Sequence, residues 1–214
     1  MPDFRVLQPY RGLYHVVFPL RPGAVGEVDL AFHFLRFQEH YESPGFKGTV
    51  FTWAQYVAWY KRVRGRFSYA WDWGGFNVPG HILTPFRQGT FDPLTRREKG
   101  LLQALTMVRP QDYVIGTLDE DPEALAHELA HAFWHLDPEY RAQAAAILAG
   151  GDYAAQHARL SAGEGYDPMV FDDEIQACAI DGDEDCAPDA ARTLKLQRLF
   201  EATQARLRRD PGQP

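Results

Sequence analysis

Hydrophobic and polar positions divide the chain into two halves of different texture. Residues 1–118 are rich in aromatic residues, glycine and proline, and short apolar runs alternate there with helical patterns. Residues 119–214 are rich in alanine, leucine and acids, in the pattern of successive capped helices. Together they predict an α+β fold, with a small mixed β-sheet and backing helices in an N-terminal lobe, 1–118, and a C-terminal helical lobe, 119–214. We expect the two lobes to form one compact unit.

In the first half, apolar runs predict strands over 12–20, 66–73 and 112–118, and a glycine-rich corner follows the second of them at 74–75. Apolar residues at helical spacing and threonine caps predict helices over 28–41, over 52–64 and from Thr95 onward. In the second half, Asp-Pro pairs and glycines predict helices over 121–136, 138–149, 152–163, 173–180 and 188–209.

The most informative stretch is His127-Glu128-Leu129-Ala130-His131. Histidines at positions i and i+4 of a helix lie on one face, so their imidazoles can converge on one divalent metal. The apolar stripe that includes Leu129 lies on the other side of this helix. Glu128 lies about 100° from His127 around the helix, where it can serve as a general base rather than a ligand.

A zinc site of this kind needs a third protein ligand and an open position. Glu174 is the best candidate, because it lies in an otherwise apolar helix beside the small residues Ala177 and Ala179, which allow another helix to approach closely. The sequence therefore predicts a zinc site formed by His127, His131 and Glu174.

Charge and composition exclude several other classes of protein. Lysine and arginine total 22 and aspartate and glutamate 29, for a net charge of −7, which argues against a nucleic-acid partner and against a polybasic membrane surface. No uncharged run approaches the ~18 residues that span a bilayer, and the first residues contain no apolar signal segment. We therefore expect a cytoplasmic protein with no membrane partner; the sequence leaves its oligomeric state open.

Histidine-Glu-Leu-Ala-His followed by an acid-bearing helix resembles the zincin metallopeptidases, and among them the gluzincins, whose third ligand is a glutamate. The resemblance implies that His127, His131 and Glu174 bind zinc, that Glu128 is the catalytic base, and that a peptide or protein substrate is cleaved at an amide bond. It also implies that a strand such as 113–116 forms the edge of the cleft, to which a peptide adds as a further strand.

The sequence departs from the gluzincin pattern at one position. Some gluzincins carry an aspartate four residues after the ligand glutamate, where it orients a ligand histidine; this chain has Cys178 there. Asp172, Asp173 and Asp181 are the alternatives for that role. Cys178 itself is expected to pack in the core, and a Cys178–Cys186 bridge is not expected in a reducing compartment.

Several neighbouring residues allow other interpretations. Asp137 stands where the metzincin pattern has its third ligand, but Trp134 replaces the required glycine and Asp137 can cap the next helix. His135 is expected to be a histidine at the end of its helix. The main functional alternative is a metal-binding regulatory or interaction protein without peptidase activity.

Three further groups of residues could belong to the site: an acidic stretch, an aromatic and glycine-rich segment, and two possible hydrogen-bond donors. The acids 181, 183 and 185 imitate a calcium loop but lack its glycine and glutamate, which favours a solvated turn. The segment 71–79 is interpreted as a corner with packed aromatics, with the rim of a cleft as the alternative. Tyr166 and His157 are candidate oxyanion stabilisers.

Overall fold

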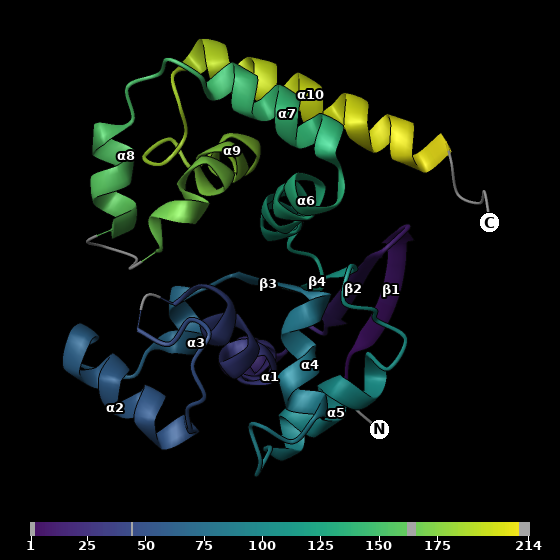
Figure 1. The fold of residues 1–214 in the computed structure, drawn as a ribbon, viewed down its shortest axis with the longest axis vertical. Coiled ribbons are helices and arrows are strands. Elements are labelled where there is room, and N and C mark those ends of the chain that lie inside the picture. Colours follow the sequence, from purple (N-terminus) through teal and green to yellow (C-terminus); the bar gives the residue numbers. More distant parts are fainter. Residues whose placement is uncertain (1–2, 44, 162–165, 210–214) are drawn as a thin grey trace.

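A four-stranded mixed β-sheet lies at the centre of the fold (Figure 1). The computed structural model describes residues 3–43, 45–161 and 166–209. The strand order is β1-β2-β4-β3; β1 pairs with β2 and β3 with β4 in antiparallel fashion, whereas β2 and β4 are parallel. The strands are β1 (Arg5–Tyr10), β2 (Leu13–Phe18), β3 (Gly75–Pro79) and β4 (Tyr113–Leu118).

The helices of the first half of the chain lie on one side of this sheet (Figure 1). These helices are α1 (Val25–Glu42), α2 (Trp53–Arg64), α3 (Tyr69–Asp72), α4 (Leu83–Arg87) and α5 (Arg96–Ala104), with 3-10 turns at Pro22–Ala24 and Gly80–Ile82. Phe34 of α1, Phe76 of β3 and Val114 of β4 meet in the aromatic-rich core on this side.

The second half supplies the helices that cover the opposite face, with α6 lying directly above the sheet (Figure 1). They are α6 (Pro122–Leu136), α7 (Pro138–Leu148), α8 (Ala154–Arg159), α9 (Phe171–Asp181) and α10 (Ala190–Arg209), with a 3-10 turn at Pro168–Val170. Ile115 of β4, Phe133 of α6 and Ile175 of α9 belong to a second core. None of the helices that the structure describes combines the length and apolar character needed to cross a membrane.

Local capping signals account for most of the helix boundaries. Thr52 and Thr95 form complete capping boxes at the starts of α2 and α5, and Gly65 ends α2 in the left-handed conformation. Asp121 and Asp137 cap α6 and α7, each followed by proline. The predicted strands at 12–20 and 112–118 and the helices from both halves are confirmed, although residues 162 and 163 of the expected 152–163 helix lie outside the described residues.

The predicted strand over 66–73 is wrong. Tyr69 and Ala70 are consecutive buried residues inside the single turn of α3, whereas Trp71 is exposed, so the buried positions do not alternate. The strand of this region begins later, at Gly75, within the segment that was interpreted as a corner. Strand β1 was not predicted, and its mostly exposed residues carry little hydrophobic pattern.

The expectation that the strand containing 113–116 forms the edge of the cleft also differs from the structure. β4, which contains 113–116, is flanked on both sides by β2 and β3, so it has no free edge. The edge strand on this side is β3, which packs against α1 and α6. Its backbone N–H at Asn77 already donates to the side chain of Gln38 (2.9 Å), which occupies one of the donors that an added strand would use.

Cys178 and Cys186 form a disulfide, contrary to the expectation that they would stay unpaired. Cys178 lies in the last turns of α9, and the chain turns at Gly182, in the left-handed conformation, to bring the Cα atoms within 5.6 Å. Both side chains are buried. The bridge closes a loop that contains Asp181 and Asp183.

Candidate metal site

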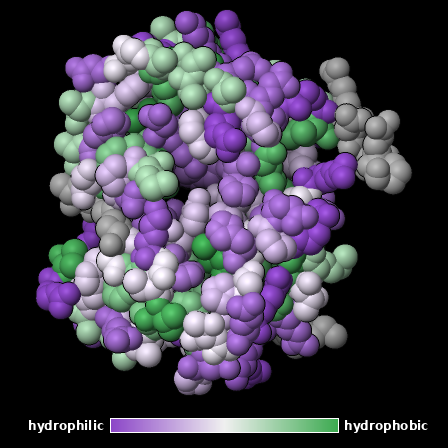
Figure 2. Space-filling model, in the orientation of Figure 1, coloured by the Kyte–Doolittle hydropathy of each residue, from purple (hydrophilic) through white to green (hydrophobic). Residues whose placement is uncertain are grey.

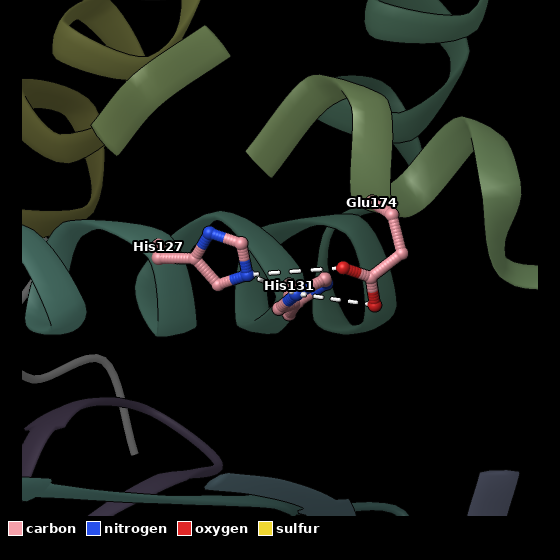
Figure 3. A group of neighbouring side chains, drawn as sticks. All are labelled: His127, His131 and Glu174. Atoms are coloured by element: carbon pink, nitrogen blue, oxygen red, sulfur yellow. Dashed lines mark hydrogen bonds and ion pairs between the residues drawn. The ribbon is translucent and has the colours of Figure 1, made fainter. Parts of the chain in front are cut away.

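Two helices bring three potential metal ligands together (Figure 3). His127 and His131 lie one turn apart on α6, and Glu174 reaches them from the first turn of α9. The Nε2 atoms of the two histidines are 3.0 Å apart. The Glu174 carboxylate oxygens lie 3.8 Å from Nε2 of His127 and 3.7 Å from Nε2 of His131.

The donor atoms fit one tetrahedral ion. Ligand atoms about 2.1 Å from a zinc ion, at tetrahedral angles, lie roughly 3.4 Å from one another. The separations of 3.0, 3.7 and 3.8 Å lie on either side of that value, the two longer ones to different oxygens of Glu174, and one ligand atom from each residue lies within 4.8 Å of the other two. Two imidazoles and one carboxylate are a donor set typical of catalytic zinc, with a fourth position left open.

Each histidine is oriented by its own aspartate. Nδ1 of His127 lies 2.6 Å from Asp181, and Nδ1 of His131 lies 2.9 Å from Asp173. A carboxylate at Nδ1 favours a proton there and leaves the Nε2 lone pair for a metal. Asp181 and Asp173 therefore take the orienting role that the sequence left open, whereas the side chain of Asp172 is exposed.

The Asp173 carboxylate is itself held by α7 and α9. Gln176 donates to Asp173 (3.0 Å) and accepts a hydrogen bond from the Tyr140 hydroxyl (2.6 Å). Gln176 and Tyr140 are fully buried. This chain of bonds ties the ring of His131 to the core of the helical half.

Glu128 lies beside the two histidines and is held by the sheet. Its Oε2 accepts a hydrogen bond from the side-chain amide of Asn77 on β3 (2.9 Å), and Oδ1 of Asn77 accepts one from the Tyr113 hydroxyl on β4 (2.5 Å). Gly75 gives the carboxylate room, because a Cβ there would lie 2.3 Å from Oε1 of Glu128. Glu128 is 4% exposed and does not belong to the ligand group.

Burial shifts the acid–base properties of these groups. It raises the pKa of Glu128 above its usual value, against the opposing effect of the two histidines. It also raises the pKa of Glu174, to about 7. Burial opposes protonation of the histidines, but the Asp181 hydrogen bond leaves the pKa of His127 raised, and Asp173 and Glu174 hold the pKa of His131 well above its usual range.

A cavity of about 540 Å³ opens onto this group of side chains. Figure 2 shows the hollow between the upper and lower halves of the molecule, with mainly hydrophilic side chains around it. Residues of β3, the end of α1, α6 and α9 line it, and Tyr166 and Trp73 stand on its walls. The segment 71–79 therefore contributes residues 72–77 to the lining of the cavity.

The rival ligands lie elsewhere. Asp137 caps α7 through the backbone N–H groups of Glu139 and Tyr140 and pairs with Arg206, so it does not take the metzincin position. His135, in the last turn of α6, packs on the ring of Tyr113. Cys178 is engaged in the disulfide.

The two candidate oxyanion stabilisers lie in different places, and the acids compared with a calcium loop have other partners. Tyr166 lines the cavity, but His157 packs against Tyr153 and Phe171 outside it. Of the three acids compared with a calcium loop, Asp181 binds His127 and Asp183 pairs with Arg159. Within the described part of the chain, His127, His131 and Glu174 are the group whose ligand atoms converge.

The contacts of Asn77 and Gly75 with Glu128, and the acids of α1, were not predicted from the sequence, although Asn77 and Gly75 belong to the segment 71–79, for which a cleft rim was the alternative. Asn77 and Gly75 act through a strand that the hydrophobic pattern did not reveal, and the paired glycines at 74–75 were the available signal. Glu39 and Glu42 lie at positions that a helical pattern alone assigns to a polar face.

Comparison of the chain with protein-family models, with curated proteins and with solved structures finds no match.

Proposed function

We propose that this chain is a zinc-dependent hydrolase with a zincin-like site, and that it cleaves amide bonds in peptide or protein substrates. One observation carries the proposal: three converging ligand atoms and a buried carboxylate outside the ligand set, Glu128, line one open cavity. A purely structural zinc site closes its coordination with four protein ligands, whereas a catalytic site keeps a position open.

A zinc ion held by His127, His131 and Glu174 would polarise the substrate carbonyl and lower the pKa of a water molecule towards about 7. Glu128 takes the proton from the attacking water and later delivers it to the leaving amine. Asn77 holds Oε2 of Glu128, which leaves Oε1 for this proton transfer. The raised pKa of Glu128 suits a general base that works near neutral pH.

The test compares Glu128→Gln with the wild-type protein. Glutamine keeps the shape of the side chain and can still accept from Asn77, but it cannot accept the proton. We expect the variant to fold, to keep its zinc and to lose hydrolysis of an unstructured protein by about 10²–10⁴-fold. Glu123→Gln, at an exposed position in the first turn of the same helix, is the matched control and should cleave normally.

Zinc content and chelator sensitivity are measured in all three proteins. Equal cleavage by the wild type and Glu128→Gln would refute the role of Glu128. Stoichiometric zinc without any chelator-sensitive cleavage would favour the alternative, a metal-binding protein without peptidase activity.

A further inference from the structure

Buried carboxylates in this fold generally have a basic partner. Glu98 forms a double ion pair with Arg36 (2.5 and 2.6 Å), and Asp112 pairs with Arg109 (2.8 Å). Asp173 faces His131 in the same way. Such pairing is expected because an isolated charge is costly to remove from water.

Two carboxylates at the end of α1 break this pattern. Glu39 is 9% exposed, and among the described residues no Lys, Arg or His forms an ion pair with it. Its polar neighbours are the hydroxyl groups of Tyr69, Tyr56 and Ser43, and those of Tyr69 and Ser43 are buried without a hydrogen-bond partner among the described residues. Glu42, which is half-buried, accepts a hydrogen bond from Gln38 (2.5 Å) and forms no ion pair with a Lys, Arg or His of those residues. Burial raises the pKa of Glu39 to about 7.

Both acids line the cavity that contains the proposed metal site. Acidic residues dominate this lining: Glu39, Glu42, Asp72, Glu128, Glu174, Asp181 and Asp183. Arg64 is the one arginine or lysine among the lining residues that the structure describes. A zinc ion would compensate the acids next to the histidines, but Glu39 belongs to the other wall, with α1 and Tyr69.

The walls near Glu39 are aromatic. Tyr69, Trp73 and Phe76 line the same cavity, and the rings of Tyr69 and Phe76 lie 5.9 Å apart. A long aliphatic stem with a terminal charge fits such a place, because the stem packs on the rings while the charge meets the carboxylates. A second hydrated metal ion would gain nothing from these rings.

We propose that the substrate carries a lysine or arginine side chain next to the scissile amide, and that Glu39 and Glu42 bind its charged end. This inference rests on the proposed function, since it places that side chain in the cavity beside the zinc site. Glu39 and Glu42 are specificity-determining residues here; neither takes part in the proton transfer.

The experiment uses matched peptides that differ at one position flanking the scissile bond, with lysine, norleucine or glutamate there. Norleucine keeps the stem and removes the charge. For the zinc-loaded wild type we expect kcat/KM for the lysine peptide to exceed that for the norleucine peptide by about tenfold or more. In Glu39→Gln and in Glu42→Gln this ratio should fall towards one, whereas Glu123→Gln should keep it.

A binding measurement separates this inference from the proposed function. Affinities of the same peptides for zinc-loaded Glu128→Gln are measured by fluorescence anisotropy, which requires no cleavage. If the zinc-loaded wild type hydrolyses none of the peptides but Glu128→Gln still binds the lysine peptide preferentially, the peptidase proposal is removed and the basic subsite remains. Cleavage or binding with no preference for lysine over norleucine would overturn the subsite.

Two further outcomes complete the test. If Glu39→Gln does not fold, as judged by near-ultraviolet circular dichroism, Glu42→Gln alone decides the question. If the wild type binds a second equivalent of zinc that Glu42→Gln loses, the acids are metal ligands and the basic subsite is wrong.

Discussion

The contact between Gly75 and Glu128 gives the sharpest prediction about the site, because the neighbouring Gly74 provides its control. A Cβ at Gly75 would lie 2.3 Å from Oε1, 2.8 Å from Cγ and 2.9 Å from Cδ of Glu128, so the carboxylate must move. A Cβ at Gly74 would meet nothing nearer than the Cβ of Ala124, at 3.9 Å, an ordinary contact. Neither glycine has a positive φ, so alanine suits both backbones.

The size of the effect follows from what Glu128 loses. Displacing its carboxylate breaks the 2.9 Å bond from Asn77, and a hydrogen bond to a charged group contributes about 1.5–3 kcal/mol. We therefore expect Gly75→Ala to lower the free energy of unfolding by about 2 kcal/mol, or about 4–8 °C in melting temperature for a chain of this length. Gly74→Ala should stay within about 0.5 kcal/mol of the wild type.

Thermal and urea unfolding of the metal-free proteins measure both substitutions. A double-mutant cycle identifies the cause: in a Glu128→Ala background the side chain that clashes is gone, so Gly75→Ala should cost much less. Equal effects of Gly75→Ala and Gly74→Ala would refute the contact. An unchanged cost in the Glu128→Ala background would show that the alanine clashes with something else.

Three further predictions concern the surroundings of the site. Asp181→Asn removes the carboxylate that orients His127, so zinc affinity measured by competition with a chromophoric chelator should fall about 10–100-fold, and an unchanged affinity would contradict that role. The pKa of Glu39 is raised from 4.5 to about 7, so its ionisation opposes folding increasingly as pH rises from about 4.5 through 7. Glu39→Gln should thus stabilise the metal-free protein by up to about 3 kcal/mol at pH 8.5 and little at pH 4.5; an equal effect at both would contradict the assignment. Thiol titration of the unfolded protein should detect no free Cys178 or Cys186 until a reductant is added, whereas two reactive thiols without reductant would contradict the disulfide.

Local signals in the sequence were sufficient for most elements and for the residues that form the proposed ligand group. The caps at Thr52, Thr95 and Asp121 act within one turn, so a single sequence contains all the information they need. The spacing of His127 and His131 places them on one face for the same reason. Glu174 was the expected third ligand because the small residues Ala177 and Ala179 on its helix allow another helix to approach closely.

Strand β3, the contact of Asn77 with Glu128 and the disulfide could not be predicted, because they depend on contacts between parts of the chain that a local pattern does not relate. β3 is short, begins with a glycine and follows the aromatic turn of α3, so its residues gave no alternating pattern. Its position at the sheet edge is fixed by pairing with β4, and that pairing brings Asn77 to Glu128, which is 51 positions away. The disulfide was rejected on an expectation about compartment, whereas the turn at Gly182 decides whether the two sulfurs meet.

Every proposal made for this protein requires that His127, His131 and Glu174 bind one metal ion. An anomalous-difference map of zinc-loaded crystals, recorded on both sides of the zinc absorption edge, tests this binding. We expect one strong peak in the cavity, about 2.0–2.2 Å from Nε2 of each histidine and from a carboxylate oxygen of Glu174. A peak held by Asp137 with Glu174 turned away, or no peak at the histidines from a protein saturated with zinc, would contradict it.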